Sequence, residues 1–137
     1  MIILDTNVVS ALMQAETQVI NWLDLQPRLS IWTTGITVLE IRFGLQIMPA
    51  GRRRREREAA FNCALTEKLE DRILPFDTRA AEETASVMAA RQSAGRPRDL
   101  RDSMIAGIAL AQRAALATRN ARHFGDLGIS LINPWGV

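Results

Sequence analysis

The chain has 137 residues, of which 47% are hydrophobic and 23% are charged, and it contains one cysteine. This composition is typical of one globular domain and excludes a disordered tail, a collagen-like fibre and a disulfide-rich scaffold. The 17 basic residues nearly balance the 15 acidic ones, for a net charge of +2, which taken alone argues against a strongly basic nucleic-acid clamp.

The first half of the chain predicts short apolar strands that alternate with helices. Residues 2–4 form a wholly apolar run that predicts a buried strand, and the turn residues after it lead into a helix over residues 8–13. Two more strands are expected, over residues 30–33 and 72–76. The spacing of apolar residues predicts further helices, over residues 17–25, from residue 37 to near residue 49, and over residues 52–69.

The second half of the chain continues this alternation. We expect an alanine-rich helix over residues 78–93, a loop over residues 95–98, and the most apolar helix over residues 99–114. Strands are expected over residues 115–118 and 129–132. This order predicts an α/β fold over residues 1–137, a single three-layer α/β/α domain around a central, mostly parallel five-stranded sheet.

Four polar residues stand at strand ends or next to apolar runs. Asp5 ends the first predicted strand and Asn120 follows the fourth, and open α/β sheets bind ligands beyond the carboxyl ends of their strands. Asp102 lies near the start of the most apolar helix, and Glu40 interrupts another apolar helix. Each also has a structural interpretation, as a helix cap, a first-turn acid, a surface position or a turn residue. Together, however, these side chains could converge on one end of the sheet.

Such a group of acids would suit a hard divalent cation. Converging carboxylates repel one another, which raises their pKa values unless a cation neutralises them. Arg42 is the one cationic residue close in sequence to Asp5 or Glu40. Oxygen ligands without His or Cys select Mg²⁺ or Mn²⁺ over zinc. A site of this kind is suited to phosphoryl chemistry, in which the ion activates water and stabilises the developing charge.

The sequence around these residues resembles the four signature blocks of PIN-domain ribonucleases. The blocks here are Ile3-Leu4-Asp5-Thr6-Asn7, Ile36-Thr37-Val38-Leu39-Glu40, Asp102-Ser103-Met104-Ile105-Ala106-Gly107-Ile108-Ala109 and Ala117-Thr118-Arg119-Asn120. Within that family the chain is most similar to VapC-class toxins of bacterial toxin–antitoxin pairs, in the FitB-like branch, which residues 72–77 and 132–135 also match. The resemblance covers essentially the whole chain.

The resemblance implies an endoribonuclease that depends on Mg²⁺ or Mn²⁺ and cuts single-stranded or loop RNA. It implies that Asp5 and Asp102 are the main metal ligands and that Glu40 helps to hold the ion or orients the attacking water. The fourth family position is often Asp, but Asn120 occupies it here. Because an amide oxygen can bind a metal but carries no negative charge, we expect one resident ion.

Further residues are expected to support these four or to bind RNA. Thr6 and Thr118 are candidate hydroxyls that orient the ligands, and Asp99, one helical turn before Asp102, could face the same site. RNA phosphates could be bound by Arg119 and by the start of the most basic stretch, Arg52-Arg53-Arg54-Arg55. That stretch is equally interpretable as a solvated helix face.

Partners also follow from the resemblance. We expect RNA as substrate, a small VapB/FitA-like antitoxin that masks the acidic site, and a homodimer that becomes a heterotetramer or larger with the antitoxin. DNA would be bound only through the antitoxin. A partner helix could pack on an apolar helical surface formed by Leu12, Leu39, Phe43 and Leu45. With neither a signal peptide nor a membrane-spanning run in the sequence, we expect no membrane association and a cytoplasmic location.

Other functions compete with this interpretation. A phosphotransfer hydrolase with an aspartyl nucleophile needs a second acid two residues after Asp5, where the chain has Asn7, and a catalytic lysine, whereas Lys68 is the only lysine. A receiver-type signalling domain fails on the same missing lysine. A non-catalytic RNA-binding or scaffold form of the PIN fold is the stronger rival, because Asn120 replaces one acid. The three remaining carboxylates favour the metal-dependent ribonuclease toxin.

Overall fold

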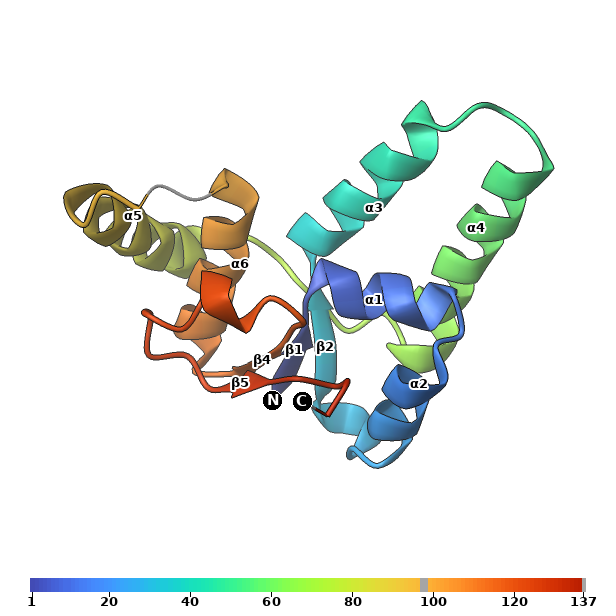
Figure 1. The fold of residues 1–137 in the computed structure, drawn as a ribbon, viewed down its shortest axis with the longest axis horizontal. Helices are drawn as coiled ribbons and strands as arrows, with labels where there is room; N and C mark the ends of the chain where they lie inside the picture. Colours follow the sequence, from blue (N-terminus) through green and yellow to red (C-terminus); the bar gives the residue numbers. More distant parts are fainter. Residues whose placement is uncertain (97–98, 137) are drawn as a thin grey trace.

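A sheet of five short strands lies at the centre of the molecule in the computed structural model, which describes residues 1–96 and 99–136 (Figure 1). The strands are β1 (Ile2–Leu4), β2 (Ile31–Thr34), β3 (Ile73–Leu74), β4 (Ala115–Ala117) and β5 (Leu131–Ile132). Their order in the sheet is β3-β2-β1-β4-β5, and each neighbouring pair is parallel. The predicted five-stranded sheet is confirmed, and all of its pairings are parallel.

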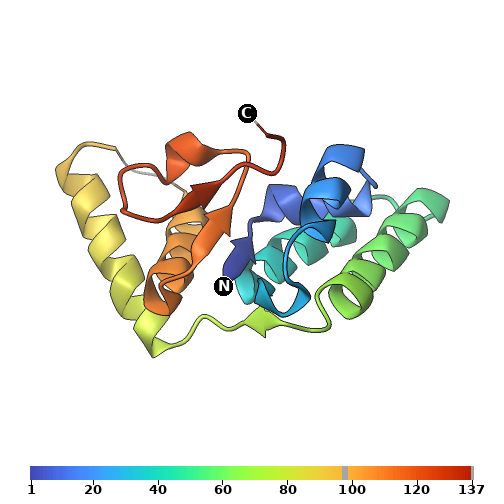
Figure 2. The ribbon, with the colours of Figure 1, turned by 90° about the horizontal axis from the view of Figure 1, so that it is seen from below.

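Helices cover both faces of the sheet, which is why its strands are mostly apolar. On one face lie α1 (Thr6–Met13), α2 (Thr17–Asp24) and α4 (Arg52–Cys63), and on the other α5 (Thr78–Ser93) and α6 (Leu100–Gln112) (Figure 2). In β1, Ile3 packs into the core on the α5 and α6 side, whereas Leu4 packs into the core on the α1, α2 and α4 side; both are fully buried. The three-layer α/β/α architecture is therefore confirmed.

Two helices begin earlier than the sequence predicts, because a polar side chain caps each of them. The helix predicted from residue 8 is α1, which begins at Thr6 directly after its N-cap Asp5. The helix predicted from residue 37 is α3 (Gly35–Ile47), whose N-cap Thr34 accepts a hydrogen bond from the backbone N–H of Thr37. Capping oxygens satisfy donors of the first helical turn, which extends each helix towards the strand before it.

Other boundaries differ by small amounts. The helix predicted over residues 52–69 is α4 followed by a π-helical turn, η2 (Ala64–Lys68), in which the backbone N–H of Leu69 donates to the carbonyl of Ala64. The strands predicted over residues 72–76 and 129–132 each keep only two residues in the sheet. The loop predicted over residues 95–98 lies in part outside the described residues. No described helix is both long and apolar enough to cross a bilayer.

The strand order fixes where a ligand can bind. The chain runs from β1 to β2 and β3 on one side of the sheet, and then crosses to β4 and β5 on the other. The order therefore reverses between β1 and β4, where the backbone N–H of Asp5 donates to the carbonyl of Ala117 at 2.9 Å. In open parallel sheets this reversal leaves a crevice at the carboxyl ends of the strands.

Candidate active site

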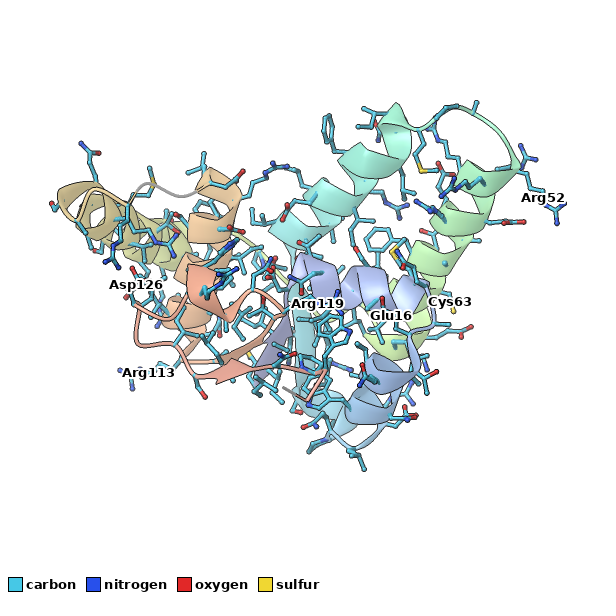
Figure 3. All side chains as sticks on the ribbon, in the orientation of Figure 1. Glu16, Arg52, Cys63, Arg113, Arg119 and Asp126 are labelled. Carbon is cyan, nitrogen blue, oxygen red and sulfur yellow. The ribbon has the colours of Figure 1, made fainter. Side chains whose placement is uncertain are left out.

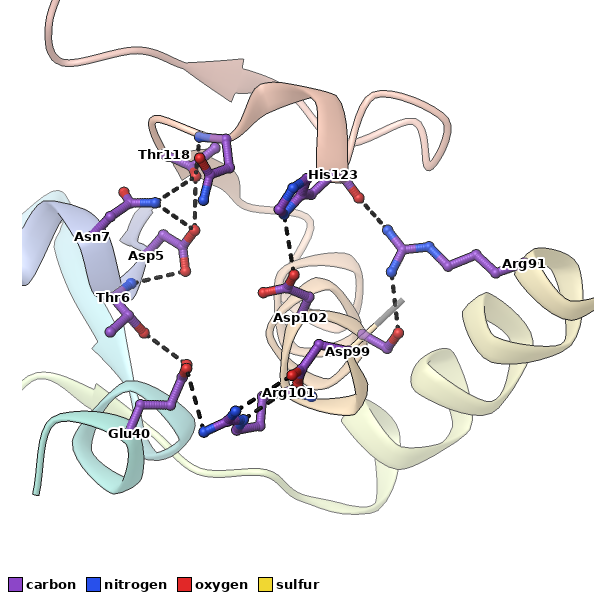
Figure 4. A network of polar contacts seen from close by, with 12 residues as sticks. Asp5, Thr6, Asn7, Glu40, Arg91, Asp99, Arg101, Asp102, Thr118 and His123 are labelled. Atoms are coloured by element: carbon purple, nitrogen blue, oxygen red, sulfur yellow. Dashed lines mark hydrogen bonds and ion pairs between the residues drawn. The ribbon is translucent and has the colours of Figure 1, made fainter. Parts of the chain in front are cut away.

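Asp5 directly follows β1 at this reversal of strand order and is only 4% exposed. One of its carboxylate oxygens accepts the backbone N–H of Thr6 at 2.8 Å, and the other accepts the hydroxyl of Thr118 at 2.7 Å (Figure 4). Burial raises the pKa of Asp5, and the Asp102 carboxylate adds to this, while the hydrogen bonds from Thr118 and Thr6 oppose it. The fold thus holds a carboxylate rigidly in an environment that disfavours its charge.

Glu40 reaches the same crevice from α3, and Thr6 orients it. The Thr6 hydroxyl donates to Glu40 at 2.9 Å, so the Thr37 hydroxyl, 3.0 Å from it, is the donor to Thr6. Burial raises the pKa of Glu40, Thr6 and Arg101 lower it, and the charges of Asp5 and Asp102 raise it again. Because Asp102 raises the pKa of Asp5, and Asp5 and Asp102 both raise the pKa of Glu40, the three carboxylates belong to one electrostatic site.

The cation nearest to Glu40 differs from the one that sequence distance suggests. Arg101 of α6 lies 3.9 Å from the Glu40 carboxylate and also pairs with Asp99 at 3.3 Å. Arg42 instead donates to Asn62 and lies over the ring of Phe61, 4.7 Å from its centroid. Neighbours in sequence point in different directions around a helix, so Arg42 leaves the site and Arg101 enters it.

Asp102 projects from the first turn of α6 and contacts His123, whose ring Nδ1 lies 3.2 Å from its carboxylate. His123 belongs to the turn η3 (Ala121–His123), which Arg91 of α5 holds against α6. The buried Arg91 guanidinium donates to the His123 carbonyl and, at 3.1 Å, to the Ser103 hydroxyl (Figure 4). Sequence reasoning missed His123; its place three residues after Asn120, beyond the end of β4, was the available signal.

Three more predicted residues take different positions. Thr118 is fully buried and bonds directly to Asp5. Asn120 is exposed, and its backbone N–H donates to the Thr118 hydroxyl at 3.0 Å; in the described part of the chain its side chain has no recorded bond to the carboxylates. Asp99 caps α6 and faces Arg101, which lowers the pKa of Asp99. Thr118 is therefore part of the acidic site, whereas Asp99 reaches it only through Arg101.

The arginines proposed for RNA divide into two groups. Arg52 stands at the free end of α4, whereas Arg119 lies near the start of α1 (Figure 3). Arg52 and Arg54 pair along α4 with Glu56 and Glu58. Arg53 and Arg55 are exposed. The Arg119 guanidinium stacks on the Trp135 ring, 4.0 Å from its centroid. Arg119 is thus the member of the predicted set that lies close to the carboxylates.

The donor set of this crevice fits a hard divalent cation by its chemistry. Its groups are carboxylate oxygens, and burial and mutual repulsion raise the pKa values of Asp5 and Glu40, which is the strain that a bound cation relieves. Among the described residues, no three Asp, Glu, His or Cys side chains already stand close enough to share an ion. Instead, the Asp102 carboxylate contacts His123, and the Glu40 carboxylate pairs with Arg101.

Comparison with known proteins places the whole chain in one group. A family model described as the PIN domain matches residues 2–129. A VapC ribonuclease, Y4jK of Sinorhizobium fredii, is 39% identical over 98% of each chain. Toxin FitB of Neisseria gonorrhoeae is 29% identical, with 98% of this chain and 99% of that protein covered. The solved structure of FitAB bound to the IR36 DNA fragment superposes with a TM-score of 0.87 at 29% identity, covering 100% of this chain and 97% of that one.

Proposed function

Because the chain belongs to the PIN-domain family, we propose that it is the ribonuclease toxin of a toxin–antitoxin pair and hydrolyses RNA phosphodiester bonds with Mg²⁺ or Mn²⁺. The observation that carries this proposal is the electrostatic coupling of Asp5, Glu40 and Asp102 at the reversal of strand order. Three coupled carboxylates, of which Asp5 is buried and the other two are partly buried, cost stability, so their presence supports a role in chemistry. RNA as substrate also accords with action in the cytoplasm.

Different residues of the site would bind the cation and orient its ligands. Asp5 and Asp102 would hold the cation, which when bound supplies a Lewis acid for the phosphate and lowers the pKa of water. Thr118 and Thr6 keep the Asp5 carboxylate fixed through their hydrogen bonds. Asn120 lends no charge, so we propose a single resident ion.

Glu40 is suited to accept a proton from the attacking water. Burial raises its pKa towards the working range of a general base, and Thr6 fixes one of its oxygens. Arg101 beside it has a side chain that is 43% exposed and can exchange its carboxylate partners for an RNA phosphate. This arrangement would bring the scissile phosphate next to Glu40, the general base.

Protein partners are part of the proposal, since the FitAB relative is a complex bound to DNA. We propose that a VapB/FitA-like antitoxin covers the acidic site, that the toxin forms homodimers, and that DNA is contacted through the antitoxin. The predicted apolar surface is only partly correct, because Leu45 is buried in the core. Leu39, Phe43 and Ile47 are exposed at successive helical turns of α3 and form the apolar stripe available to a partner.

The test is RNA cleavage by purified protein with Mg²⁺ or Mn²⁺. EDTA should stop it, and Asp5→Asn should lower the rate by more than about 100-fold, beyond the usual cost of removing a group that merely supports a metal ligand. Circular dichroism should show that this variant stays folded. A wild-type protein that bound RNA yet left it intact with either ion would support the non-catalytic alternative instead.

A further inference from the structure

A cavity of about 300 Å³ opens beside the acidic site, between α1, α3 and α4. Figure 1 shows these helices on the side of the molecule away from α5 and α6. Thr6 and Glu40, which are bonded to each other in the acidic site, also line this cavity. A group bound here therefore lies directly next to the carboxylates that act on the phosphodiester bond.

The inner wall of the cavity is apolar. Met13 of α1, Ile41 and Leu45 of α3, and Met48 just after α3 line it. The volume is at the lower end of the range for small-molecule sites, so the cavity suits one flat ring system and is too small for a folded segment. Flexible, polarisable methionines from two segments of the chain are well suited to pack on an aromatic ring.

The remaining lining residues are polar, and Arg57 brings a positive charge opposite in sign to that of Glu40. Ser10 of α1 and Gln14 just after α1 offer hydrogen-bonding groups, and the exposed Arg57 lines the cavity from α4. In the part of the chain that the structure describes, Arg57 has no ion-pair partner, in contrast to Arg52 and Arg54 on the same helix. An apolar slot with hydrogen-bonding edges and a free cation has the chemistry that recognises a nucleotide.

We propose that this cavity binds one base of the RNA substrate, beside the phosphodiester bond that is cut. The inference rests on the proposed function and deepens it by naming a subsite. The base lies between Met13 and Met48, the hydrogen-bonding edges of Ser10 and Gln14 select among bases, and Arg57 contacts a neighbouring phosphate. The subsite thereby makes cleavage depend on sequence at one position next to the cut.

Gly44 of α3 allows a sharp test, because it lines the cavity and a Cβ added there would meet nothing within 4 Å. The leucine side chain of Gly44→Leu would project from α3 into the cavity and fill much of it, whereas the methyl group of Gly44→Ala would fill only a little. Gln46→Leu, on an exposed position of the same helix, is the matched control. Thermal unfolding should show all three variants folded, since leucine and alanine favour helix over glycine.

The experiment measures cleavage of a random-sequence single-stranded RNA pool, with sequencing of the cut ends, and hydrolysis of bis(p-nitrophenyl) phosphate, which has no base. For Gly44→Leu we expect KM for RNA to rise about tenfold, a typical loss for one base contact, and the base preference next to the cut to weaken. Ester hydrolysis should stay within about twofold of wild type. Gln46→Leu should leave the KM for RNA, the base preference and the rate of ester hydrolysis unchanged.

The two proposals fail separately in this design. Wild-type protein that hydrolyses neither substrate with Mg²⁺ or Mn²⁺ would refute the ribonuclease function itself. If wild type cleaves RNA and Gly44→Leu retains the same KM and the same cut-site bases, the base subsite is refuted.

Discussion

At the scale of single residues, Thr6 does the most to set the geometry of the acidic site. Its backbone N–H donates to Asp5, and its hydroxyl donates to Glu40 while it accepts from Thr37. One residue thus fixes two carboxylates that come from different segments. The backbone contact is present whatever the side chain, whereas the contact to Glu40 depends on the hydroxyl.

Removing that hydroxyl should therefore impair Glu40 and leave Asp5 in place. We expect Thr6→Val, which has nearly the same shape, to lower kcat for RNA about 10- to 100-fold, as for other groups that orient site ligands. Thr6→Ser keeps a hydroxyl and should retain most of the activity. Single-turnover rates of the three proteins check this. If Thr6→Ser and Thr6→Val lost the same fraction of kcat, the packing of residue 6, and not its hydrogen bond to Glu40, would be what activity requires.

The sequence predicted which acids lie near enough to influence one another, but not what each one touches. Asp5 could be placed because it follows an apolar strand, and β-strand ends share an edge of the sheet. Arg101 and His123 could not be paired with Glu40 and Asp102, because those contacts depend on how α6 and η3 pack. That packing is set by the buried Arg91, whose partners lie in other segments.

At the scale of elements, α5 and α6 pack unusually closely at Gly107. A Cβ added at Gly107 would lie 1.9 Å from the Thr84 hydroxyl and 2.7 Å from the Ala80 carbonyl oxygen. The Thr84 hydroxyl itself donates to that carbonyl. Because a backbone atom closes the contact, the neighbouring helix cannot give way by a simple rotamer change. The position of α6, which carries Asp102, therefore depends on the absence of a side chain at residue 107.

Gly107→Ala should separate the two helices and destabilise the protein. We expect a loss of about 3 kcal/mol in the free energy of unfolding, at the upper end of the usual cost of overpacking. Gly44→Ala is the control, because α3 has open space there, and it should be neutral or stabilising by up to about 1 kcal/mol. Urea unfolding measures both. A Gly107→Ala protein as stable as Gly44→Ala would contradict the close packing.

Element order could be predicted from the sequence better than element ends. The alternation of apolar runs with helical periodicity is a local property, so the strand and helix sequence followed from it. Helix starts at Thr6 and Gly35 depend on whether Asp5 and Thr34 cap a helix or merely form a turn. The two-residue strands β3 and β5 lie at the sheet edges, where pairing with one neighbour, and not composition, decides their length.

At the scale of the whole molecule, the acidic site opposes folding stability near neutral pH. The folded state raises the pKa values of Asp5 and Glu40, so between the ordinary and the raised values it holds more protons than the unfolded chain. Their contribution to stability is therefore present at low pH and is lost as the pH rises through the raised pKa values. A cation that binds the ionised carboxylates would reverse this loss.

Mn²⁺ should consequently stabilise the wild-type protein most near pH 7. In EDTA, we expect Asp5→Asn to unfold at a higher urea concentration than wild type at pH 7, and the difference to shrink as the pH is lowered, because protonation then relieves Asp5. Mn²⁺ at 100 times its dissociation constant should add about 2.7 kcal/mol to wild type and much less to Asp5→Asn. Since other carboxylates are common to both proteins, the difference between them isolates the acidic site. An equal Mn²⁺ response in the two would mean that the ion binds elsewhere.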